Sequence, residues 1–262
     1  MKRQLVSILL GTTLIASAAM MPVLADTAER QETIENAEQL KAAIALAMED
    51  GQFSEAEEAD IAAAATEEAV ADLMAEKLDL AVNVLNHSGT EQSMRSFPDG
   101  TEYGIQTYDL GDGCQMTVEL RDQAEGLSAG MAAPLAVTGE WKAYGNRYFT
   151  AMTTVTVAGY NVKLGLENHY ILSSKGIDED YGNAIYDKKE TPCLISPGEK
   201  VIEDGVARTP GASDVNMYCN FTCKAGAVTS KYKLDTTVQY LAHDTSGKRI
   251  KVGHTWKLTK LS

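Results

Sequence analysis

The sequence predicts a mainly β protein, in which an acidic α-helical hairpin precedes an antiparallel β-sandwich. From residue 105 to residue 262, apolar and polar residues alternate in short runs, and glycine-rich turns separate these runs. Residues 26–86 are instead rich in alanine, glutamate and leucine and contain one glycine and no proline, which favours helix. Residues 87–104 have turn formers and no periodicity, and they are the expected linker.

Residues 1–25 are typical of a signal peptide. Lys2 and Arg3 give a positive start, an apolar run follows, and small residues precede a cleavage site after Ala25. An uncleaved membrane anchor is the alternative, although glycine, threonine, serine and proline interrupt or end the apolar run. No later stretch reaches the ~18 consecutive apolar residues of a spanning helix. The expected product is therefore secreted and extracellular, with no membrane insertion after signal cleavage.

Acidic residues are concentrated near the start of the chain. Residues 26–86 carry 16 acidic and 3 basic side chains, whereas residues 87–262 carry 21 and 18. A chain of net charge −14 without a dense basic patch has no general attraction to nucleic acid, so nucleic acid is not an expected partner. The expected partner is an unknown extracellular protein or glycan.

Two helices are expected in the acidic segment. The first carries an apolar stripe at helical spacing and ends at Gly51, and the second begins at a capping box formed by Ser54 and Glu57. Because few residues join them, the helices should pack as an antiparallel hairpin. Three roles stay open for this segment: a solvated helical spacer, a pair of interaction helices, or a pro-segment removed after export.

The β segment opens with a hairpin, in which residues 105–110 and 114–121 flank a glycine-rich turn. A three-stranded meander is expected between residues 137 and 176, with turns at Gly145 and Asn146 and at Ala158 and Gly159. Residues 177–211 hold three of the six prolines and are expected to form loops with short edge strands. Three further strands are expected around residues 217–223, 232–241 and 250–258.

Aromatic residues near the first turn of the meander form a candidate ligand platform. If they gather at one end of the sheet, their flat rings would contact a glycan or a peptide at low entropic cost. The alternative is that Trp141 and Phe149 belong to the core and that the tyrosines surround it. The candidate binding residues are Trp141, Tyr144, Tyr148, Tyr160 and His169.

The four cysteines are disulfide candidates, because an exported chain meets oxidising conditions. Cys219 and Cys223 on one strand would lie about 13 Å apart, beyond the ~7 Å limit between the Cα atoms of a disulfide. Cys114 and Cys193 would then pair with them, in either order. Four buried free thiols are the alternative. No metal site is expected, because this cysteine pair would splay its sulfurs.

No residue pattern defines a reaction, so the chain is not expected to be an enzyme or to hold a cofactor. The sequence lacks a nucleophile elbow, a P-loop, a zinc-protease motif and a dinucleotide fingerprint. His169 shares a strand face with Glu167 and Lys163, a pattern more typical of a solvated face than of an acid–base couple. His254 lies on an apolar face as a core histidine. Residues 177–181 are acidic but lack the spacing of a calcium loop.

The stretch GEWKAYGNRY, residues 139–148, and the later Asn168, His169 and Tyr170 resemble uncharacterised secreted β-sandwich domains of Gram-positive bacteria. The resemblance extends over residues 102–262 and implies no catalytic residue. The same opening strand is similar to that of small secreted sandwich bacteriocins. We therefore expect a secreted, non-catalytic extracellular binding or interaction module. The alternative is a secreted antibacterial or toxin-like effector with an acidic pro-segment, and an uncharacterised hydrolase is the third.

Overall fold

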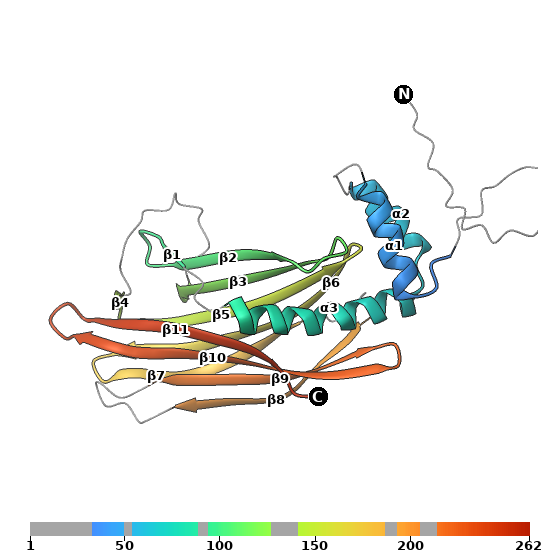
Figure 1. The fold of residues 1–262 in the computed structure, drawn as a ribbon. Coiled ribbons are helices and arrows are strands. Elements are labelled where there is room, and N and C mark those ends of the chain that lie inside the picture. Colours follow the sequence, from blue (N-terminus) through green and yellow to red (C-terminus); the bar gives the residue numbers. More distant parts are fainter. Residues whose placement is uncertain (1–32, 50–53, 89–93, 127–140, 187–192, 205–213) are drawn as a thin grey trace, which may run out of the picture. The chain divides into compact units, whose positions relative to one another are not determined.

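A computed structural model of the chain describes residues 33–49, 54–88, 94–126, 141–186, 193–204 and 214–262. The expected signal peptide, residues 1–25, lies outside the described residues. The described residues form three helices and eleven strands in two antiparallel sheets (Figure 1), which confirms the predicted mainly β class. No helix among them is long and apolar enough to cross a membrane.

The elements follow one another as helices first and strands afterwards. The helices are α1 (Ala37–Ala47), α2 (Glu55–Ala64) and α3 (Glu67–Ser88). The first strands are β1 (Arg95–Ser96), β2 (Glu102–Asp109), β3 (Gln115–Ala124), β4 (Trp141–Ala143), β5 (Gly145–Val157) and β6 (Tyr160–Ser173). The last strands are β7 (Gly176–Tyr186), β8 (Cys193–Asp204), β9 (Val215–Ala225), β10 (Val228–Asp244) and β11 (Arg249–Lys260).

The strands form two layers (Figure 1), and buried residues of both sheets belong to one hydrophobic core. The first sheet has the order β1-β2-β3-β5-β6-β7, and the second has the order β4-β11-β10-β9-β8. The ring of Phe149 on β5 lies 4.5 Å from that of His254 on β11, centroid to centroid. On β6, the side-chain amide of Asn168 donates to the carbonyl of Val215 on β9. The alternating buried positions of β5 are those that the sequence predicts for a strand with one inner face.

The long helix α3 is part of the same core. It contacts β5 of the first sheet and β9, β10 and β11 of the second, and Leu73, Met74 and Leu78 are buried there (Figure 1). Its Lys77 is also buried and donates to the carbonyl of Leu110 at 3.0 Å and to the carboxylate of Asp112 at 2.7 Å. The helical segment therefore helps to build the β core.

The acidic segment contains three helices where the sequence predicts two. The capping box of Ser54 and Glu57 starts α2 as expected. At Ala65 the backbone then becomes extended, with ψ of 137°, because it pairs with the backbone of Ile34 in an isolated parallel β-bridge. The N–H of Thr66 donates to the carbonyl of Ile34 at 2.9 Å. This pairing with a residue far back in the chain divides the predicted second helix into α2 and α3.

The predicted meander and linker differ from the structure. Strand β4 pairs with β11 in the second sheet, so the chain changes sheets before Gly145 instead of forming a hairpin there. The β5–β6 hairpin is present, and its turn residues Ala158 and Gly159 both have positive φ. Within the predicted linker, α3 continues to Ser88, β1 pairs with β2, and β2 begins at Glu102. Residues 177–211 contain two long edge strands, β7 and β8.

The disulfide predicted for Cys114 is not formed. Cys114 precedes β3 in the first sheet as a buried free thiol, whereas Cys219 and Cys223 lie buried on β9 in the second sheet. Among the described side chains, no two cysteines are joined by a disulfide. Burial is the main cause that raises the pKa of the Cys114 thiol to about 11. The side chain of Cys193 lies outside the described part of the chain.

Candidate ligand-binding face

Three rings lie in a row across neighbouring strands on the outer face of the first sheet. Tyr148 on β5 is the register partner of His169 on β6, and their rings stack at 5.2 Å. Tyr181 on β7 stacks on the histidine from the next strand, at 3.9 Å and an interplanar angle of 17°. His169 is only 5% exposed, whereas Tyr181 is 45% exposed. We call these three residues the ring row.

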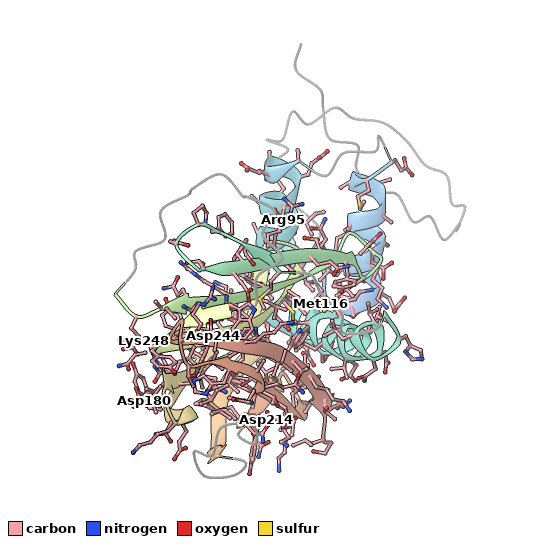
Figure 2. All side chains as sticks on the ribbon, turned by 90° about the vertical axis from the view of Figure 1, so that its left-hand side faces the viewer. Arg95, Met116, Asp180, Asp214, Asp244 and Lys248 are labelled. Atoms are coloured by element: carbon pink, nitrogen blue, oxygen red, sulfur yellow. The ribbon has the colours of Figure 1, made fainter. Side chains whose placement is uncertain are left out.

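A β-bulge brings Tyr181 to this position. Asn168 pairs with Gly182 and Tyr170 pairs with Glu179, so that Asp180 and Tyr181 together oppose His169. Such a bulge turns the side chains of the longer strand away from their regular alternation. Asp180, one of the two residues of the bulge, is labelled in Figure 2. Strand β7 is an edge strand, so no further strand of its sheet covers Tyr181.

Two carboxylates hold the central imidazole. Nδ1 of His169 lies 2.8 Å from Oε1 of Glu125, and Nε2 lies 2.6 Å from Oε1 of Glu167. A ring that carries a proton on both nitrogens donates to both carboxylates. The hydrogen bond from His169 is the main cause that lowers the pKa of Glu125. The predicted solvated strand face is therefore wrong at His169, because stacking and these contacts bury the ring.

The structure brings together two of the five candidate binding residues. Tyr148 and His169 touch, but Tyr144 contacts His243 instead, through its hydroxyl and ring. Trp141 is exposed and lies against the guanidinium of Arg249, so the alternative that made it a core residue is wrong. Tyr160 is nine residues from His169 along β6, about 30 Å at the rise of a strand. The candidate platform is thus not one surface.

A second polar group is buried between the sheets around Asp122 of β3. Its carboxylate accepts hydrogen bonds from Nε of Arg147 at 3.1 Å and from the hydroxyl of Tyr170 at 3.0 Å. Nε2 of His254 lies 3.2 Å from its other oxygen, and Nζ of Lys142 lies 3.6 Å from it. Burial opposes ionisation of Asp122, but the charges of His254, Arg147 and Lys142 hold its pKa well below its usual value.

Glu102, Asp122 and His254 form the group of potential metal ligands found among the described residues, with donor atoms within 4.8 Å of one another. Nζ of Lys142 lies 3.0 Å from Glu102, and this lysine and Arg147 together balance the two carboxylates. A divalent cation would add two positive charges to a buried set whose two carboxylates are already balanced, which is costly. The charges therefore favour a structural ionic network at this place.

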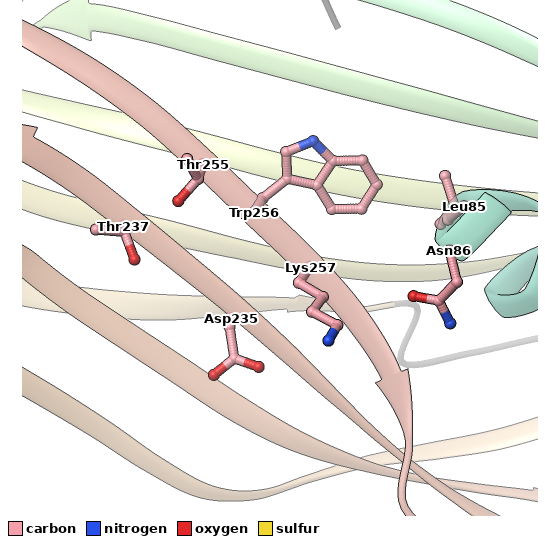
Figure 3. Close-up of a pocket in the computed structure, with 7 residues that line it drawn as sticks. All are labelled: Leu85, Asn86, Asp235, Thr237, Thr255, Trp256 and Lys257. Carbon is pink, nitrogen blue, oxygen red and sulfur yellow. The ribbon is translucent and has the colours of Figure 1, made fainter. Parts of the chain in front are cut away.

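A pocket of about 490 Å³ lies between the end of α3 and strands β10 and β11 (Figure 3). The indole of Trp256 forms one wall, but it is buried, so little of its ring face is open to a ligand. None of the residues proposed from the sequence lines this pocket. The lining consists of Leu85, Asn86, Asp235, Thr237, Thr255, Trp256 and Lys257.

Gly182 allows the two sheets to approach behind the ring row. A Cβ atom at this position would overlap the Sδ and Cε atoms of Met217 on β9 and would lie 3.2 Å from the carbonyl oxygen of Glu167. We therefore expect Gly182→Ala to lower the free energy of unfolding by about 1–3 kcal/mol, as overpacking does. Urea unfolding measures this change.

The matched control is Gly253→Ala, because the atoms nearest to its added Cβ belong to the flexible side chains of Gln239 and Leu241. The double variant Gly182→Ala/Met217→Ala should lose less free energy of unfolding than the two single variants lose together, since the overlap disappears. Strictly additive costs would contradict the predicted close contact.

Comparison of the chain with known protein families, with curated proteins and with solved structures finds no match. The ring row and the carboxylates around it are therefore the observations from which a function is argued. Sequence reasoning missed Tyr181, Glu125 and Asn183 at this face. The glycine directly after Tyr181 was the available signal, because an isolated glycine within a strand is typical of a bulge.

Proposed function

We propose that this chain is a secreted, non-catalytic extracellular binding module that contacts its ligand through the ring row. The observation that carries the proposal is the exposed ring of Tyr181, which stacks on His169 and lies near three carboxylates. A rigid aromatic ring contributes contact area at a small cost in conformational entropy, and such rings dominate the affinity of binding surfaces. Secretion is proposed from the signal-like residues 1–25.

The contacts of His169 favour binding over catalysis. A general base needs a ring nitrogen that can take a proton from the substrate. Both nitrogens of His169 already face carboxylate oxygens, at 2.8 and 2.6 Å. The other histidine next to a carboxylate, His254, is enclosed between the sheets beside Asp122 and is out of reach of a substrate. This arrangement supports a site that holds a ligand without converting it.

The experiment compares two tyrosine variants on an array of glycans and peptides. We expect Tyr181→Ala to weaken the binding of any ligand of the wild-type chain by about tenfold or more, as loss of a central aromatic contact does. Tyr160→Ala is the matched control, because Tyr160 lies on the same sheet at the far end of β6. Biolayer interferometry on the purified chains gives the affinities.

The proposal fails if both variants bind every array ligand as the wild type does. It also fails if the wild-type chain converts an array ligand and this turnover is lost in His169→Ala. Circular dichroism of each variant confirms that the fold is kept, so that loss of binding is not loss of structure.

A further inference from the structure

The charge around Tyr181 indicates which ligand the ring row would take. Partial desolvation comes first among the causes that raise the pKa of Tyr181, and the negative charges of Glu125, Glu167 and Asp180 add to it. The negative charges of three carboxylates are therefore felt at Tyr181, the well-exposed ring of the row. The face of an aromatic ring attracts a cation, and negative charges close to the ring strengthen this attraction.

The hydrogen bonds around the ring row leave acceptors open to a ligand. Asn146 and Asn183 each direct a side-chain N–H to Glu125 and Glu167 respectively, both at 3.3 Å, and His169 engages both carboxylates. One N–H of each asparagine and both ring nitrogens of His169 are thus already engaged by these carboxylates. Each carboxylate has about four lone-pair sites, and the two side chains remain 32% and 25% exposed. A ligand that satisfies the remaining acceptors must bring N–H or O–H donors.

We propose that the ring row recognises an arginine side chain of an extracellular protein partner, with the guanidinium stacked on Tyr181 and donating to Glu125 or Glu167. A planar guanidinium matches both features at once, because it stacks on aromatic faces and donates to a carboxylate through two parallel N–H groups. An ammonium is a point charge without a flat face, so lysine fits less well. This inference rests on the proposed function and names its ligand.

The test uses three blocked pentapeptides with two arginines, two lysines or two glutamines between glycines, and isothermal titration against the full chain. We expect the arginine peptide to bind, the lysine peptide to bind about fivefold more weakly, and the glutamine peptide not to bind. Tyr181→Leu and Glu167→Gln should each lower the affinity for the arginine peptide by about fivefold to tenfold, the range of a partly exposed cation–π or ion-pair contact.

Glu119→Gln is the matched control, since Glu119 lies on β3 of the same sheet, away from the ring row, and the change removes the same charge. Equal weakening by Glu119→Gln and Glu167→Gln would overturn the inference, because it would show general attraction to an acidic chain. Absence of binding by the arginine peptide would also overturn it. If a glycan on the array binds and Tyr181→Ala abolishes this, the proposed function stands and only the arginine ligand is wrong.

Discussion

A chain that begins at residue 89, and so lacks all three helices, is expected not to fold. The large apolar side chains that α3 buries belong to the same core as those of the two sheets, and they are Val70, Leu73, Met74, Leu78, Val82 and Leu85. Full burial of a large apolar side chain contributes about 1.5–3 kcal/mol. The loss of six is therefore about 10 kcal/mol or more, comparable to the whole stability of a domain, about 5–15 kcal/mol.

Two longer chains are the controls for this truncation. A chain that begins at Thr33 retains every helix and should unfold cooperatively in urea. A chain that begins at Thr66 keeps α3 but loses the buried Leu40 and Ile44 of α1, so it should still unfold cooperatively, with a midpoint below that of the chain from Thr33. Near-ultraviolet circular dichroism follows the packing. A cooperative transition in the shortest chain would contradict the role given to α3, and would favour a removable acidic pro-segment.

The largest effect of a single substitution is expected at Asp122. In Asp122→Ala, the buried Arg147 and Lys142 lose the carboxylate that lies between them, and one buried positive charge remains without a partner. Breaking a buried ionic network by removing one member costs about 3–5 kcal/mol. Chemical denaturation measures the loss. Glu119→Gln on the outer face of the same strand is the control, and it should change the stability by less than about 0.5 kcal/mol.

The contribution of Asp122 should disappear in acid. Its pKa is lower in the folded chain than in the unfolded chain, so the stabilisation is complete above the unfolded pKa of about 4 and is lost as the pH falls towards the folded pKa. The difference in unfolding free energy between the wild type and Asp122→Ala should therefore be constant near neutral pH and shrink below about pH 4. A difference that grows on acidification would refute the ionised carboxylate.

Local patterns predicted the parts of the fold that local forces determine. The capping box at Ser54 needs only neighbouring residues, and so does the β5–β6 turn at Ala158 and Gly159, where both residues take positive φ. The break at Ala65 and the pairing of β4 with β11 were missed. Each depends on a partner distant in the sequence, Ile34 in the first case and residues 249–251 in the second. No spacing within the element itself reveals such a partner.

The candidate site was predicted in part for the same reason. Tyr148 and His169 could be placed near each other because they face each other across a hairpin. Tyr181 reaches them only through the bulge, which shifts the register of β7 by one residue and which simple alternation does not anticipate. Regular alternation also placed His169 in solvent, because it takes no account of neighbouring rings that cover an outward side chain.

The long-range contacts of α3 also determine when this chain can complete its folding. Asp79 of α3 accepts a hydrogen bond from Tyr232 at 2.8 Å and pairs with Lys260 at 2.6 Å, so partners more than 150 residues apart must meet. Contacts at such separations slow folding. Until the ribosome has released the final strand, α3 cannot make all of its native contacts. Delayed folding of this kind would help the export that we propose, because a chain that is still unfolded can pass through a narrow translocation channel.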